Sequence, residues 1–245
     1  MRPAPYCGTP PLPAELWTRF NLDPVLIVIL ILACVAHLWL LHDGRKRLAA
    51  GAGWLIAAVA LVSPLCALSV SLFAARVSQH MLLILVAAPF LAWAMPGRRA
   101  GSGFELWTSA MLFFLALWFW HMPTPYDATF TSVGIYWSMH ISLFGAAIWL
   151  WKCLLHHAPE QTIGTLAAGA ATSVQMGLLG AVLTFAEHPL FAWHLTTTWP
   201  WGLTPLQDQQ LGGVVMWVPG IAFFLWAIGR TLTRLFEALE GARAA

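Results

Sequence analysis

Seven apolar runs, each close to the length that crosses a lipid bilayer, dominate this chain of 245 residues. About 20 consecutive apolar residues span the hydrocarbon core as a helix, because an α-helix rises about 1.5 Å per residue. The runs cover residues 24–41, 50–65, 76–95, 104–121, 133–151, 162–185 and 211–231. None of them alternates apolar and polar residues as a barrel strand does. The chain is therefore predicted to be all-α, a polytopic transmembrane helical bundle with seven spans.

The composition excludes several classes of protein. Sixty per cent of the residues are apolar and only 9% are charged, whereas about a quarter of the residues in a soluble domain are charged. The formal net charge of +2 gives no electrostatic footprint for nucleic acid. We therefore expect the lipid bilayer as a partner, no nucleic acid, and no second folded domain.

The basic residues predict the orientation of the spans. If the spans alternate, only Arg2, Arg19 and Arg76 fall on one side of the membrane. The other side receives Arg45, Lys46, Arg47, Arg98, Arg99, Lys152, Arg230, Arg234 and Arg243. Because cytoplasmic loops carry the excess of Lys and Arg, the N-terminus is expected outside and the C-terminus in the cytoplasm.

This orientation divides the chain into three parts. Residues 1–23 form a periplasmic N-terminal segment, residues 24–231 the seven-helix transmembrane domain, and residues 232–245 a cytoplasmic C-terminal tail. The first 23 residues lack the apolar centre and small-residue cleavage site of a signal peptide. We therefore expect the first apolar run to be retained as a span.

The four cysteines are Cys7, Cys34, Cys66 and Cys153, which lie far apart and lack the spacing of a metal site. Cys7 and Cys66 fall on the same, oxidising side, so a disulfide between them is the alternative. Because free buried cysteine is common in proteins, we expect four free thiols.

Three histidines lie at similar depths in consecutive spans. His80 lies about one turn, or roughly 6 Å, below the outer end of its span, and His140 lies about 10 Å deep. His121 closes its span at the outer surface. Consecutive antiparallel helices usually pack as neighbours, so the three side chains can converge. Four other histidines, His37, His42, His156 and His157, fall toward the cytoplasmic side and are expected to be interfacial polar groups.

Methionines adjoin these outer histidines, as at Met81 and Met139. Imidazole and thioether together suit copper, particularly Cu(I). We therefore predict one Cu(I) ion held by His80, His121 and His140, with Met139 or Met81 as fourth ligand. His121 would take up the ion and His140 would retain it. In the alternative, the histidines only form interhelical hydrogen bonds and the methionines only fill gaps.

The outer loop over residues 186–210 contains no Lys or Arg but includes Glu187, His194 and Asp208. It is expected either to fold over the outer end of the bundle as a lid or to rest on lipid headgroups. Asp208 is expected to cap the helix of the last span. The adjacent glycines Gly212 and Gly213 are expected to allow close contact between helices.

Four segments carry a family resemblance: Ser63-Pro-Leu65, then Gln79-His-Met-Leu-Leu83 with Ala88-Pro89, then His121-Met-Pro123 with Tyr126-Asp127, and finally Leu206-Gln-Asp-Gln-Gln-Leu-Gly-Gly-Val-Val-Met-Trp217. Over residues 50–230 the chain resembles the CtaG family of cytochrome c oxidase assembly factors, the polytopic kind. The resemblance implies a multi-pass protein of the bacterial inner membrane that is not an enzyme and that handles copper at the periplasmic face. Its expected partners are oxidase subunits or a copper chaperone.

The chain departs from the family pattern at several positions and has fewer potential metal ligands than family members usually carry. Family members usually carry His-Met where this chain has Arg76-Val77, and His and Glu where it has Tyr136 and Met139. The guanidinium of Arg76, one turn from His80, disfavours a nearby cation. This repulsion would be relieved if the Arg76 side chain pointed to the interface or paired with Asp208 or Glu187.

Three other functions remain open at this point. A copper transport or resistance protein would need a polar path across the membrane. A haem-binding redox protein would need facing histidines, which His80 and His140 supply. A structural partner of the oxidase would use the same polar groups only to hold its helices together.

Overall fold

The computed structural model describes residues 5–95, 103–157 and 159–244, and all regular structure within these residues is helical, with no strand. The all-α prediction is confirmed. The helices are α1 (Pro24–Trp39), α2 (Gly44–Val62), α3 (Pro64–Ser71), α4 (Phe73–Met81), α5 (Ala88–Ala94), α6 (Gly103–Trp120), α7 (Pro123–Ala128), α8 (Val133–Leu155), α9 (Thr162–Thr184) and α10 (Pro205–Ala244). A π-helix, η2 (Leu82–Ala87), joins α4 to α5. Short 3-10 helices are η1 (Pro13–Thr18), η3 (Pro159–Gln161), η4 (Ala192–Leu195) and η5 (Trp199–Trp201).

Five helical segments in the described residues are long and apolar enough to cross a membrane. They are Phe73–Ala94, Gly103–Trp120, Val133–Leu155, Thr162–Thr184 and Pro205–Glu237. The pair α2 and α3 gives a sixth span if it crosses as one unit, although it bends by 48°. Helix α1 is apolar but has only 16 residues. Length and composition therefore support five or six spans.

The bend between α2 and α3 has a local cause. Pro64 occupies the first turn of α3 and Ser63 precedes it, with its side-chain oxygen accepting a hydrogen bond from the backbone N–H of Leu65. Proline cannot donate the backbone hydrogen bond that would continue α2, and serine is a favoured N-cap. Ser63-Pro64, which predicts the end of the second span, therefore also begins a new helix that runs in another direction.

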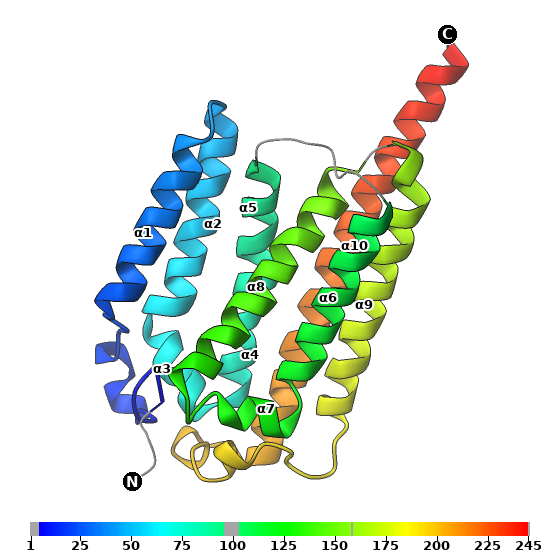
Figure 1. The fold of residues 1–245 in the computed structure, drawn as a ribbon. Coiled ribbons are helices and arrows are strands. Elements are labelled where there is room, and N and C mark those ends of the chain that lie inside the picture. Colours follow the sequence, from blue (N-terminus) through cyan, green and yellow to red (C-terminus); the bar gives the residue numbers. More distant parts are fainter. Residues whose placement is uncertain (1–4, 96–102, 158, 245) are drawn as a thin grey trace.

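The helices stand side by side in a bundle with two distinct ends (Figure 1). Residues 5–23, α3, α7 and residues 185–204 lie at one end, which we call the N-terminal end. The C-terminal half of α10 projects beyond the opposite end (Figure 1). The chain therefore enters at one end of the bundle and leaves at the other.

Glycines bring α10 close to α9 and to α4. A Cβ atom at Gly213 would lie 2.7 Å from the carbonyl oxygen of Gly180, on α9. A Cβ atom at Gly212 would lie 2.6 Å from a ring carbon of Phe73, on α4. No side chain fits at either position without displacing a neighbour, so the predicted close contacts at Gly212 and Gly213 are confirmed.

Asp208 caps α4 and not its own helix, so that prediction is wrong. Helix α10 begins at Pro205, which puts Asp208 inside its first turn and ends the preceding loop at residue 204. The Asp208 carboxylate accepts hydrogen bonds from the backbone N–H groups of Phe73 (2.6 Å) and Ala74 (3.0 Å). Leu72, at the N-cap of α4, offers no side-chain hydrogen bond. A carboxylate suits this helix end because its exposed N–H groups carry partial positive charge.

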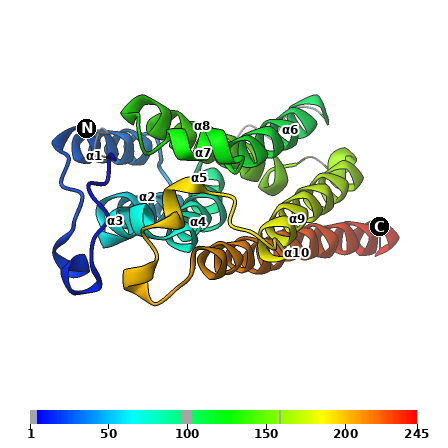
Figure 2. The same ribbon diagram turned by 90° about the horizontal axis from the view of Figure 1, so that it is seen from below.

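Residues 185–204 fold over the N-terminal end of the bundle, which is the first of the two predicted arrangements. Figure 2 shows this segment, in yellow and gold, lying across the end beside α4 and α7. Phe191 stacks on Phe73 with ring centroids 4.4 Å apart, and Trp193 stacks on Phe130 at 4.5 Å. The indole of Trp193 also donates to the carbonyl of Val70 (2.9 Å). These contacts close the bundle above the histidines.

Cys7 and Cys66 form a disulfide, with 5.5 Å between their Cα atoms. The expectation of four free thiols is therefore wrong for this pair, whereas Cys34 and Cys153 are free. The pairing spans 59 residues, so it depends on how the N-terminal segment packs against α3, which local spacing does not reveal. The disulfide attaches the N-terminal segment to the bundle.

His194, in η4 of the covering segment, is buried in its neutral form. Its Nδ1 lies 3.2 Å from the carbonyl oxygen of Ser71, which only accepts, so Nε2 accepts from the hydroxyl of Tyr126 (2.8 Å). Burial, and then the positive charge of Arg76, lower the pKa of His194 from 6.5 to about 3.

This depressed pKa predicts a loss of stability in acid. The unfolded chain takes up a proton near pH 6.5 and the folded chain only near pH 3, so the His194 contribution is complete above pH 6.5 and is lost as the pH falls between these values. The expected slope is about 1.4 kcal/mol per pH unit. We expect His194→Gln to have a lower free energy of unfolding than the parent at pH 7, but to lose less of it between pH 7 and pH 5. Denaturant unfolding at the two pH values measures this loss, and an equal loss in both proteins would contradict the assignment.

Candidate functional site

Three histidines from three elements meet beneath the covering segment. His80 lies on α4, His140 on α8, and His121 immediately after α6. The His80 ring centroid lies 5.8 Å from that of His121 and 5.3 Å from that of His140. Their exposed fractions are only 1%, 4% and 3% respectively. The structure therefore brings together the three histidines that the sequence placed in one layer.

Each of these imidazoles has a ring nitrogen without a hydrogen-bond partner. His121 Nδ1 lies 2.7 Å from the carbonyl oxygen of Leu117, and His140 Nδ1 lies 3.0 Å from that of Tyr136. A carbonyl oxygen only accepts, so both protons lie on Nδ1 and the Nε2 lone pairs stay open. Both Nε2 atoms, and both nitrogens of His80, are buried and unpaired. Nδ1–H donation to a backbone carbonyl is also the way a metal-binding histidine is held.

The position of His121 differs from the prediction. It was expected at the outer surface, where it would take up an ion, but it is buried. The ring of Phe73, on α4, contacts His121 (6.4 Å between ring centroids) and is itself stacked on Phe191 of the segment over residues 185–204. The apolar run ends at residue 121, but the chain then folds back over that end. Span boundaries alone do not reveal such a cover.

Most other outer polar groups serve as links between helices. Gln79 Nε2 donates to the carbonyl of Ala60 (2.8 Å), and Gln175 Oε1 accepts from the indole of Trp118 (2.9 Å). Asp208 caps α4, and His188 is exposed. Asp208 and His188 therefore add no donor to the three histidines, whereas Gln79 Oε1 is buried and has no hydrogen-bond partner.

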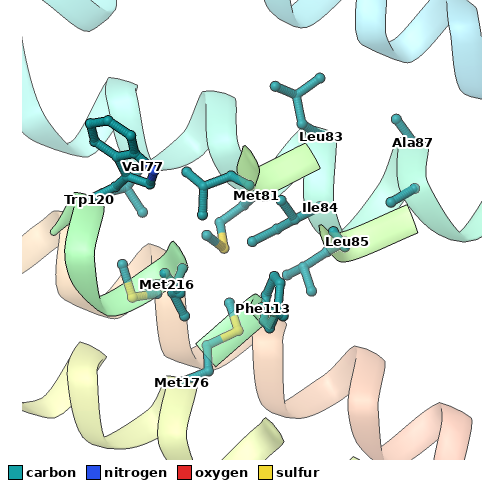
Figure 3. Close-up of a cluster of buried hydrophobic side chains, with 14 of the residues drawn as sticks. Val77, Met81, Leu83, Ile84, Leu85, Ala87, Phe113, Trp120, Met176 and Met216 are labelled. Carbon is teal, nitrogen blue, oxygen red and sulfur yellow. The ribbon is translucent and has the colours of Figure 1, made fainter. Parts of the chain in front are cut away.

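The methionines predicted as fourth ligands are both buried. Figure 3 shows Met81 in a cluster of apolar side chains, pointing into the same space as Met176 and Met216. Met139 is fully buried beside His140 in the sequence. A role for Met81 or Met139 as ligand remains a prediction.

Arg76 lies buried near this site and follows neither of the two expected arrangements. It does not reach the interface, and it forms no ion pair with a carboxylate in the described residues. Its Nε donates to the carbonyl of Ser69 (3.4 Å), and its guanidinium carbon lies 4.6 Å from the ring centroid of Phe130 and 5.4 Å from that of Tyr136. Aromatic faces attract cations, which explains how the charge is accommodated.

The charge on Arg76 restricts which ion fits. Repulsion between two cations grows with the product of their charges, so a monovalent ion is repelled half as strongly as a divalent one. Three neutral imidazoles with open nitrogens fit Cu(I) under this restriction. In the described residues, no group of three or more His, Cys, Asp or Glu side chains is placed so that it could hold a metal ion. Copper binding at the three histidines would therefore require their side chains to move.

The helix that carries His80 changes its hydrogen-bonding pattern one residue after Met81. Residues Leu82–Ala87 form a π-helix, and Pro89 follows in the first turn of α5. Proline lacks the N–H that an α-helix would donate to the carbonyl four residues earlier. The indole of Trp151 donates to the carbonyl of Ile84 within this segment (2.7 Å). Such π-helical turns often occur at functional sites, and Pro89 is the sequence signal that points to this one.

The family described as cytochrome c oxidase caa3 assembly factor (Caa3_CtaG) matches residues 36–238. The match includes all four segments on which the family resemblance was based. Comparisons with curated proteins and with solved structures found no match.

Proposed function

Because the chain belongs to the family of cytochrome c oxidase caa3 assembly factors, we propose that it handles copper at the periplasmic face of the bacterial cell membrane while the oxidase is assembled. The observation that carries the proposal is the set of unpaired, buried ring nitrogens on His80, His121 and His140. A buried polar atom without a partner costs stability, and a bound ion would remove that cost.

The histidines would hold copper as cargo and not as a catalytic centre. Neutral imidazoles suit Cu(I), and the nearby charge of Arg76 disfavours divalent ions. Oxidase subunits or a copper chaperone would exchange the ion with this site. Since the histidines are buried and Phe191 of residues 185–204 packs on Phe73, which contacts His121, exchange would require this segment to open.

We further propose seven spans, with the N-terminus outside and the C-terminus in the cytoplasm. Sixteen residues give α1 a length of about 24 Å, and its Val28, Ile31 and Leu32 side chains are exposed and apolar, which suits contact with lipid. Residues 5–23 and the end of α10 lie at opposite ends of the bundle (Figure 1), which an odd number of crossings requires. Of the basic residues behind the orientation, Arg2, Arg98 and Arg99 lie outside the described residues, and Arg76 is buried and no longer counts as a surface charge.

Accessibility labelling tests this topology. In a Cys34→Ser, Cys153→Ser background, we introduce Glu15→Cys or Glu240→Cys, both at exposed positions. A membrane-impermeant maleimide should label residue 15 in intact cells and residue 240 only after permeabilisation. The background without an added cysteine is the control, since Cys7 and Cys66 are paired. Labelling of both positions from the same side would contradict an odd number of spans.

Deletion of the gene is expected to abolish most terminal oxidase activity while leaving the haem of the oxidase largely in place, because only copper delivery fails. The measurements are oxygen uptake and the haem spectrum of membranes. The parent gene should restore activity, and a variant with alanine at positions 80, 121 and 140 should not. An unchanged oxidase with altered copper efflux would favour a transport protein instead.

The structure gives little support to the other candidate functions. Apolar side chains such as Phe113, Leu85 and Met176 pack around Met81 (Figure 3), which counts against a polar path for transport through this part of the core. The rings of His80 and His140 are in contact, with centroids 5.3 Å apart, so no slot for a porphyrin lies between them.

A further inference from the structure

The two sulfur atoms of the Cys7–Cys66 disulfide have different surroundings. Cys7 is half-buried in the N-terminal segment, whereas Cys66 is fully buried in the first turn of α3. The hydroxyl oxygen of Tyr136 lies 3.4 Å from the Cys7 sulfur and 3.8 Å from the Cys66 sulfur. The side-chain amide of Asn21 donates to the Cys66 sulfur (3.6 Å). Cys7 is therefore the more exposed of the two residues, and the Cys66 sulfur is the one that also receives the Asn21 amide.

These surroundings suit Cys66 as the leaving group in thiol–disulfide exchange. The exchange is faster when the departing thiolate is stabilised, and helix N-termini and nearby cations stabilise thiolates. Cys66 lies at such a helix N-terminus and has a donor that Cys7 lacks, the Asn21 amide, whereas the Tyr136 hydroxyl is within reach of both sulfurs. The guanidinium of Arg76 lies 5.4 Å from the centroid of the same Tyr136 ring that contacts both sulfurs. No carboxylate in the described residues pairs with this charge.

We propose that Cys7–Cys66 is an exchange-active disulfide that accepts two electrons from a dithiol protein at the N-terminal end of the bundle. A thiolate of the partner attacks the Cys7 sulfur, so a partner–Cys7 disulfide forms, the Cys7–Cys66 bond breaks and the electron pair leaves on Cys66. The partner's second thiolate then attacks its own sulfur in the mixed disulfide and releases Cys7. The two protons of the partner's thiols end on Cys7 and Cys66, and the partner becomes the disulfide.

The N-terminal segment stays in place when the bridge opens. The hydroxyl of Tyr6 donates to the carboxylate of Asp23 (2.5 Å), and its ring packs on Tyr136 and Trp137 at centroid distances of 4.8 and 5.1 Å. These contacts do not involve the sulfur atoms. The two thiols therefore remain neighbours after reduction, and the reaction is reversible.

The exchange is tested by reduction of the purified, folded protein with dithiothreitol. In a Cys34→Ser, Cys153→Ser background, free thiols are counted over time by alkylation with a maleimide that adds mass. Asn21→Ala and Tyr136→Phe each remove one donor to the departing sulfur, and each should slow the reduction by about tenfold. Thermal unfolding of the oxidised variants checks that they are folded.

Thr18→Val is the matched control. It removes a hydroxyl from the same N-terminal segment that donates to the carbonyl of Glu15 and contacts neither sulfur, so its reduction rate should equal that of the parent. If Asn21→Ala and Tyr136→Phe are reduced as rapidly as Thr18→Val, or if the bridge resists reduction until the chain unfolds, the disulfide is only a structural link and the proposal is wrong.

A second measurement needs no change near the bridge. Brief exposure to glutathione followed by acid quenching and mass spectrometry should find the mixed disulfide on Cys7 and a free thiol on Cys66, and the opposite assignment would overturn the proposal. Both measurements are made without copper. Their failure would therefore leave the proposed copper function unaffected, and a failure to bind copper would leave this proposal unaffected.

Discussion

Replacement of His140 by alanine is expected to weaken Cu(I) binding at least tenfold, which corresponds to about 1.4 kcal/mol. Its Nδ1–H is fixed to the carbonyl of Tyr136, so its free Nε2 is held ready as a donor. The two remaining imidazoles cannot close the coordination shell. Competition with a Cu(I) chelator of known affinity measures the change, and His80→Ala and His121→Ala should behave alike.

The effect on stability separates a ligand from a structural histidine. His140→Leu removes a buried nitrogen that has no partner, so the metal-free variant should be as stable as the parent or more stable while copper is lost. A histidine that only linked helices would show the reverse. His37→Ala is the binding control, because His37 lies on α1 and accepts from the indole of Trp54 (3.3 Å). Retention of copper by His140→Ala together with its loss from His37→Ala would place the site elsewhere.

Asp208→Ala is expected to lower the free energy of unfolding by about 3 kcal/mol, because hydrogen bonds to charged groups contribute about 1.5–3 kcal/mol each and two buried N–H groups lose their acceptor. These are the N–H groups of Phe73 and Ala74 at the start of α4. Denaturant unfolding of the detergent-solubilised protein measures the loss. Copper affinity should also fall, because α4 carries His80.

Two variants calibrate this expectation. Asp208→Asn retains one oxygen that accepts but loses the charge, so its cost should be intermediate. Asp43→Ala removes the same kind of cap from α2, where Asp43 accepts from the N–H groups of Arg45 and Lys46 at an exposed site. Its cost should be about 1 kcal/mol. If Asp208→Ala is no less stable than Asp43→Ala, the buried cap on α4 contributes no more to the free energy of unfolding than the exposed cap on α2.

The features that the sequence predicted well depend on local pattern. Each apolar run falls on helical structure, and Ser63-Pro64 ends α2 where expected, although α10 is much longer than its apolar run. His80, His121 and His140 meet because α8 packs both against α6 and against the segment from α4 to α5. The expected packing of consecutive spans holds for α6 and α8, whereas α6 hardly contacts α4. The pair Gly212 and Gly213 near the start of α10 predicted a close helix contact, because two residues without side chains let another helix approach.

The features that the sequence did not predict depend on contacts between distant residues. Asp208 has the position and chemistry of a cap for its own helix, and only the packing of α10 on α4 reveals its different partner. The cover over His121 and the Cys7–Cys66 pair likewise arise from how the N-terminal end folds. Arg76 shows the same limit, since its neighbours Phe130 and Tyr136 are remote in the sequence.

Helix α10 runs as one unbroken helix from one end of the bundle to the other. Its 40 residues measure about 60 Å, and it projects beyond the bundle on the side away from the histidines (Figure 1). A shift of α10 along its axis would move Asp208 and with it the first turn of α4, where Phe73 and Ala74 lie seven and six residues before His80. Pro219, inside α10, removes one backbone hydrogen bond, so sideways bending is absorbed there. A movement along the axis of α10 would therefore reach α4, whereas a sideways movement of its projecting end would be taken up by bending at Pro219.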